Sequence, residues 1–199
     1  MSSAPRSWID GCVAAHSALL GDIGDLTDDQ ARRDSLLPGW TVGHVLTHLA
    51  RNADSVVRRL EGAARAEVLD QYEGGLEGRR AAIDEGAGRP ARALVADVAG
   101  SAAAAERAMA TLPDAAWDRP SRTSRGVLED SRSVVFSRWR EVAVHHGDLG
   151  LRPEGVVLPR RLVDEWLPRE LGALADRTDP AALLAWILGR GPAPELASW

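Results

Sequence analysis

Apolar residues recur along most of this chain at the spacing of three and four residues that is typical of amphipathic helices. Glycine, proline and polar segments separate the periodic stretches. The pattern predicts four long helices and three shorter ones, over residues 8–23, 42–61, 90–110 and 128–146, and 77–85, 160–177 and 180–188. This pattern predicts an all-α fold. We expect residues 1–150 to form an antiparallel four-helix bundle and residues 151–199 to form a short C-terminal helical extension.

Three residues are expected to mark helix ends. The Thr41 hydroxyl can accept a backbone N–H at the start of the second long helix. Pro90 suits the first position of the third, and Gly147 suits the residue that closes the fourth. Residues 25–34 are expected to be a polar segment and residues 114–127 to be irregular.

Composition and charge exclude several classes of protein. The 199 residues carry 24 basic side chains, all of them arginine, against 29 acidic ones, for a formal net charge of −5. This balance gives no electrostatic basis for binding nucleic acid or an anionic membrane. No stretch approaches the length of apolar residues that a membrane span needs, and the N-terminus lacks the apolar core of a signal peptide. We therefore expect a cytoplasmic protein that acts on a small molecule.

Cys12 is the sole cysteine, which excludes an internal disulfide and a cysteine-cluster metal site. We interpret it as a small core residue of the first helix. Any metal must be held by carboxylates and by some of the five histidines, His16, His44, His48, His145 and His146.

Glu141 and His145 are four residues apart, so on a helix their side chains lie on one face. Such a pair alone is common on protein surfaces. His48 lies among apolar residues of the second long helix and is expected to face the interior, where a lone histidine is usually a hydrogen-bonded core residue. The three can also converge from two helices, as two histidines and one glutamate, a ligand set found in open zinc sites and in non-haem iron sites.

Two further histidines flank these positions. His44 is one turn before His48 and could be a fourth ligand or orient a ligand, although the rim of the site is the favoured place. His146 is rotated by about 100° from His145 on a helix, which predicts that it lies outside the site.

Three runs of sequence resemble one known family. Residues 37–54 contain the Leu37-Pro38-Gly39-Trp40-Thr41 start and His48, and they resemble the N-terminal signature of the mycothiol-dependent maleylpyruvate isomerases. Residues 139–150 and 182–191 resemble the second signature and the C-terminal segment of that family, in the same order. The family belongs to the DinB-like metalloenzymes, so the resemblance implies a DinB-like four-helix bundle.

The resemblance also implies roles for individual residues. It makes His48, Glu141 and His145 the ligands of a zinc ion, or of another divalent metal. It places a catalytic arginine after the second long helix, where Arg79 is the better match and Arg80 the other, and a second one at Arg190. A forked guanidinium suits the binding of a carboxylate, whereas the alternative for each is a solvated surface arginine.

The implied activity uses mycothiol, a thiol of actinobacteria, as co-substrate. A metal-bound thiolate would add to the double bond of an electrophile such as maleylpyruvate, and rotation followed by loss of the thiol would give cis–trans isomerisation. A mycothiol S-transferase of detoxification or secondary metabolism would start in the same way and keep the thiol attached. A bundle that binds metal or ligand without turnover is a third possibility, and either a monomer or a homodimer is compatible with all three.

Overall fold

The computed structural model describes residues 3–153 and 155–197, and these form two compact units that divide between residues 157 and 158. The first unit contains the elements α1 (Arg6–Ile23), α2 (Asp28–Arg32), α3 (Val42–Ala64), α4 (Gly75–Ala87), α5 (Ala91–Thr111), β1 (Pro120–Arg122), β2 (Leu128–Asp130) and α6 (Ser131–Asp148). The second contains α7 (Arg160–Ala173) and α8 (Pro180–Ile187). Short 3₁₀ turns cover Asp114–Ala116 and Leu174–Asp176. The all-α prediction is confirmed.

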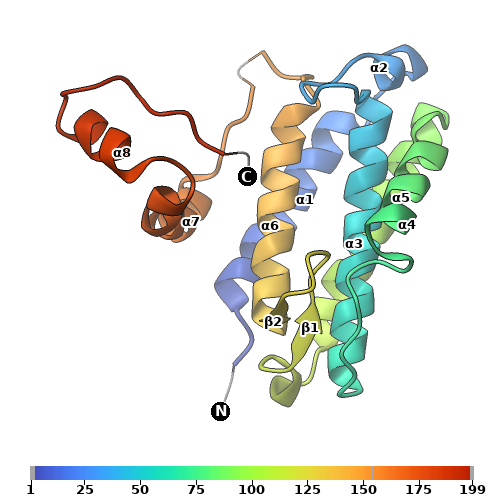
Figure 1. The fold of residues 1–199 in the computed structure, drawn as a ribbon. Helices are drawn as coiled ribbons and strands as arrows, with labels where there is room; N and C mark the ends of the chain where they lie inside the picture. Colours follow the sequence, from blue (N-terminus) through green and yellow to red (C-terminus); the bar gives the residue numbers. More distant parts are fainter. Residues whose placement is uncertain (1–2, 154, 198–199) are drawn as a thin grey trace. The chain divides into compact units, whose positions relative to one another are not determined.

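A four-helix bundle formed by α1, α3, α5 and α6 makes up the body of the first unit (Figure 1). Helix α3 packs against α5, α6 and α4, and α1 packs against α6 and α5. Helix α3 is central because buried residues lie around most of its circumference: Val45, Leu46 and Leu49 are on its apolar side, and buried polar residues such as His48 and Asn52 are on other sides. The predicted division of the chain at residue 150 into bundle and extension stays a prediction.

The helix boundaries agree with the sequence pattern except at a few ends. Thr41 begins α3 as predicted, and its hydroxyl accepts the His44 N–H. Pro90 precedes α5 rather than opening it, because its backbone is extended, with a ψ of 145°. The N–H of Ala91, the first helical residue, donates to the Asp28 carboxylate at 2.7 Å. Gly147 lies inside α6, which continues to Asp148.

Two short elements differ from the sequence prediction. Helix α2 occupies part of the polar segment, where Thr27 and Gln30 form a reciprocal capping box. Residues 120–122 and 128–130 pair as an antiparallel hairpin, so the fourth long helix begins at Ser131 and not at residue 128. Asp130 caps it by accepting the N–H of Ser133 at 2.8 Å.

Arg138 is one of the charged residues that the bundle encloses. Arg138 of α6 is 1% exposed, and its guanidinium donates to the Leu49 carbonyl at 2.8 Å, to Asn52 Oδ1 at 2.9 Å and to His16 Nε2 at 3.1 Å. His16 Nδ1 lies 2.7 Å from Glu106 Oε1. These bonds link α6, α3, α1 and α5 through the core.

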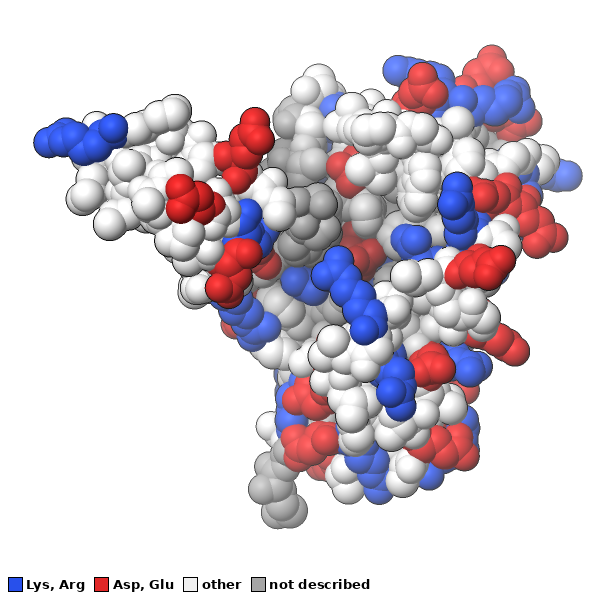
Figure 2. Space-filling view, in the orientation of Figure 1, with Lys and Arg blue, Asp and Glu red and all other residues white. Residues whose placement is uncertain are grey.

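The surface agrees with the mixed charge of the sequence. On the face drawn in Figure 2, arginine side chains lie among acidic ones and do not form one continuous basic surface. Among the described helices, none is both long and apolar enough to span a lipid bilayer.

Candidate metal and substrate site

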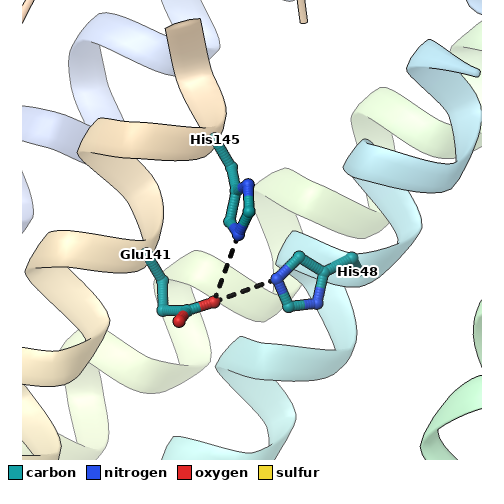
Figure 3. A group of neighbouring side chains, drawn as sticks. All are labelled: His48, Glu141 and His145. Carbon is teal, nitrogen blue, oxygen red and sulfur yellow. Dashed lines mark hydrogen bonds and ion pairs between the residues drawn. The ribbon is translucent and has the colours of Figure 1, made fainter. Parts of the chain in front are cut away.

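His48, Glu141 and His145 converge between α3 and α6 (Figure 3). One ligand atom from each lies within 4.8 Å of the other two, and this is the one group of three or more such residues within the described part of the chain. His48 Nε2 is 2.9 Å and His145 Nε2 is 3.6 Å from the same oxygen, Glu141 Oε2. The structure thus brings together the three residues that the sequence put forward as ligands.

Local structure explains how these side chains reach one another. The Thr41 N–H donates to the His44 ring at 3.2 Å, and this bond closes a capping box at the start of α3. His48 follows about one helical turn later and is buried. On α6, Glu141 and His145 are also one turn apart. His44 therefore caps the start of α3, and it also lines a cavity beside the site.

The protonation states suit metal ligation. Burial lowers the pKa of His48 to about 4, and its effect outweighs the hydrogen bond to Glu141 and the negative charge of that carboxylate, which both raise the pKa. Burial raises the pKa of Glu141, but the hydrogen bond from His48 and the nearby positive charges outweigh this and lower the pKa to about 2. At neutral pH the site therefore presents a neutral imidazole and an ionised carboxylate, the forms in which these groups bind cations.

The spacing also fits a small cation. Ligand atoms about 2.1 Å from a tetrahedral zinc ion lie about 3.4 Å apart, and the two distances to Glu141 Oε2 are on either side of that value. The His48 and His145 rings meet edge to face, with centroids 4.7 Å apart, so they do not block each other. The donor set and its spacing therefore fit a divalent metal.

Asp148 is part of the site and was missed by the sequence reasoning. Its Oδ2 is 2.8 Å from His145 Nδ1, so this contact turns the other ring nitrogen, Nε2, toward Glu141 Oε2 at 3.6 Å. Metal-binding histidines are commonly oriented in this way by a carboxylate. The spacing of three residues between His145 and Asp148 on a predicted helix was a signal that could have revealed it.

Arg79, for which the resemblance implied a catalytic role, lies beside His48. It comes from α4, and its Nη2 is 3.0 Å from His48 Nδ1. Helix α4 approaches α3 closely where Gly43 faces it, since a Cβ on Gly43 would lie 2.2 Å from the Ala87 carbonyl oxygen. Arg80 is exposed and paired at 4.0 Å with Asp84, and it lines a cavity next to Arg79.

Two cavities border Arg79. One, of about 470 Å³, is lined by Trp40, His44, Leu76 and Ile83 among others, and the Trp40 ring lies edge-on to His48 with centroids 5.7 Å apart. The other, of about 330 Å³, is lined by polar side chains that include Tyr72 and Arg58. A small molecule beside the cluster would therefore meet a guanidinium and an aromatic wall.

The remaining sequence candidates lie outside this cluster. His146 pairs with Asp22 at 2.8 Å, as expected for a residue outside the site. Cys12 is fully buried, and burial raises the pKa of its thiol to about 12. Arg190 belongs to the second unit, where it follows α8 and is exposed, and its catalytic role stays a prediction.

Comparison with known proteins agrees with this picture of the fold. Two crystal structures of the mycothiol-dependent maleylpyruvate isomerase are similar. One is 20% identical, with a TM-score of 0.80 over 98% of this chain and 96% of that chain. The other, of a histidine-to-alanine mutant, is 22% identical with a TM-score of 0.73, and it covers 80% of this chain and 66% of that chain. No curated protein matches significantly.

The family model gives the most direct assignment. The model of the mycothiol maleylpyruvate isomerase N-terminal domain matches residues 12–150, from within α1 to just after the end of α6. The matched segment contains His48, Arg79, Glu141 and His145. The chain therefore belongs to the family of the mycothiol maleylpyruvate isomerase N-terminal domain.

Proposed function

We propose that this protein is a metal-dependent enzyme of the mycothiol-dependent maleylpyruvate isomerase type. The observation that carries the proposal is the convergence of His48, Glu141 and His145 beside the Arg79 guanidinium, within the segment that matches the family model. Zinc is the metal we propose. When bound, such a cation supplies positive charge that lowers the pKa of a thiol and favours the thiolate.

Each residue of the site has its own proposed role. Glu141 and the two histidines hold the cation, and Asp148 keeps the His145 ring turned toward it. The protein offers no thiol at the site, because Cys12 is buried and protonated. The nucleophilic sulfur must then come from a small molecule, for which we propose mycothiol.

Arg79 suits the electrophile. Its fork can bind a substrate carboxylate at two points, and its charge would stabilise negative charge that develops on an α-keto acid during thiol addition. Trp40 and Ile83 line the larger cavity next to it and would limit access of water to that group. Arg190 is a candidate for a second carboxylate contact. The cytoplasmic location and actinobacterial origin expected from the sequence remain predictions.

Product analysis tests the reaction type. The zinc-loaded protein is incubated with mycothiol and maleylpyruvate, and both the organic product and the free thiol are followed. Conversion to the trans isomer without net consumption of thiol is the expected result. A thiol adduct that accumulates would indicate an S-transferase, and metal binding without any product would indicate a non-catalytic binding protein.

Two variants make this test specific to the site. His48→Ala removes a proposed ligand and is expected to abolish turnover. His146→Ala removes a neighbouring histidine that pairs with Asp22 outside the cluster, so it is expected to keep both metal and turnover. Full turnover by His48→Ala would contradict the proposal.

A further inference from the structure

His48 uses both of its ring nitrogens. Nε2 faces Glu141 Oε2 at 2.9 Å, and Nδ1 faces Arg79 Nη2 at 3.0 Å. A guanidinium can only donate hydrogen bonds, so Nδ1 must accept. A neutral ring then carries its single proton on Nε2 and donates it to Glu141.

Metal binding needs the opposite tautomer. Nε2 is the nitrogen directed at Glu141 and His145 (Figure 3), so it is the one that would bind a cation. A neutral ring with a free lone pair on Nε2 has its proton on Nδ1. That proton and the Arg79 N–H would both be donors, so the contact between Arg79 and His48 cannot persist once Nε2 holds a metal.

Arg79 has other partners within reach. Its guanidinium carbon lies 5.7 Å above the centre of the Tyr72 ring, and the residue borders both cavities. A carboxylate that enters either cavity would offer a charged acceptor, which binds a guanidinium more strongly than an imidazole nitrogen does.

We infer that Arg79 couples the binding of a carboxylate ligand to the binding of the metal. Without a carboxylate, Arg79 holds His48 in the tautomer that cannot bind a cation through Nε2. A carboxylate takes Arg79 away and lets the ring adopt the metal-binding tautomer. The inference rests on the proposed metal site. Because such coupling is reciprocal, the metal must strengthen carboxylate binding by the same factor.

Metal affinity provides the first test. The Kd of Co²⁺ is measured by calorimetry and visible absorption for the metal-free protein, with and without maleate and with no thiol present. Arg79→Met is expected to bind Co²⁺ about tenfold more tightly than the unsubstituted protein, since a hydrogen bond to a charged group is lost from the competing state. Maleate is expected to tighten Co²⁺ binding several-fold in the unsubstituted protein and to have no effect in Arg79→Met.

Arg65→Met is the matched control, because it removes the same charge from an exposed position that lines neither cavity. It is expected to leave both Kd values unchanged. An unchanged or weaker Kd in Arg79→Met, a maleate effect that persists in that variant, or equal tightening by Arg65→Met would each overturn the coupling.

The tautomer is a second readout that needs no metal. The ¹⁵N shifts of His48 in the metal-free protein are expected to show the proton on Nε2, and in Arg79→Met a larger share on Nδ1. A proton on Nδ1 in the unsubstituted protein would overturn the inference. If the unsubstituted protein binds no Co²⁺ at all, the proposed metal site and the coupling both fail, whereas Co²⁺ binding that Arg79→Met does not alter removes only the coupling.

Discussion

Two chains of hydrogen bonds in the bundle have the same composition, arginine to histidine to glutamate. In one, Arg138 donates to His16 Nε2 at 3.1 Å, and His16 Nδ1 faces Glu106 at 2.7 Å. In the other, Arg79 donates to His48 Nδ1, and Nε2 faces Glu141. In both, burial keeps the histidine neutral, with the pKa lowered to about 3 for His16 and about 4 for His48.

The surroundings of the two chains differ. Arg138 is anchored by three acceptors inside the core, whereas Arg79 touches cavities and has an aromatic ring beside it. Glu141 also faces a second imidazole, that of His145. The sulfur of Cys12 lies 3.9 Å from His16 Nε2, but burial holds its pKa near 12 and keeps it protonated.

The comparison shows what distinguishes a binding site from a structural network. Residue types are shared, and so is the neutral histidine. The Arg79–His48–Glu141 chain has a second imidazole facing its carboxylate and an arginine that borders two cavities. The arginine of the Arg138–His16–Glu106 chain is enclosed in the core. We therefore expect substitutions in the first to change ligand binding and substitutions in the second to change stability.

The largest expected effect separates the two histidines. His48→Gln is expected to lose stoichiometric metal, because an uncharged amide replaces a ligand. His16→Gln, the matched change in the core chain, is expected to keep it. Metal content after dialysis, measured by mass spectrometry, provides the test, and normal metal in His48→Gln would remove the basis of the proposed site.

Acid should destabilise the metal-free protein through both histidines. In the unfolded chain each imidazole titrates near 6.5, but in the folded protein the pKa is about 3 for His16 and about 4 for His48. Below pH 6.5 the unfolded chain binds protons that the folded protein does not. The contribution of the two neutral imidazoles to the free energy of unfolding is therefore complete above that pH and decreases below it. It should fall toward pH 4 by on the order of 1 kcal/mol per pH unit for each imidazole.

Urea unfolding between about pH 7 and about pH 5 measures this slope. His16→Gln is expected to reduce the slope by roughly half. A slope that stays the same in that variant would show that the burial of His16 does not set its protonation.

Arg138→Met is expected to destabilise the protein by about 3 kcal/mol, because it leaves Asn52 Oδ1 and the Leu49 carbonyl buried without their donor. Arg79→Met, whose side chain is only partly buried, is expected to cost about 1 kcal/mol or less. Denaturant midpoints of the two metal-free variants give the comparison, and equal losses would contradict the division between structural and ligand-binding chains.

Asp148→Asn should weaken metal binding by about tenfold to a hundredfold, since the carboxylate no longer orients His145. Titration of the metal-free variant with Co²⁺ measures the loss. The fold should be unaffected, so an unchanged far-ultraviolet circular dichroism spectrum is the control, and an unchanged Kd would exclude an orienting role for this carboxylate.

The smallest effect is expected for Cys12→Ala. The sulfur is buried and protonated, so turnover with mycothiol should be unchanged and stability should fall by about 1 kcal/mol. Loss of turnover in a folded variant would mean that the protein's own thiol takes part, which would contradict the need for an external one.

Much of this fold was accessible from local pattern. The long helices are amphipathic over many turns, and Thr41 starts α3 through its own hydroxyl, so both features are determined by neighbours in sequence. The one-turn spacing of Glu141 and His145 has the same origin. The hairpin of residues 120–130 was not accessible, because strands of three residues carry little periodicity and are stabilised by their partner.

What the sequence determined by itself was the helical class, the inward face of His48 and a set of candidate ligands. What only the tertiary structure decided was which groups meet. Helix packing brings Arg79 to one nitrogen of His48 and Glu141 to the other, and it encloses a second, similar chain around His16. These contacts join residues from different helices, so their geometry depends on how the helices pack, which no local pattern along the chain encodes.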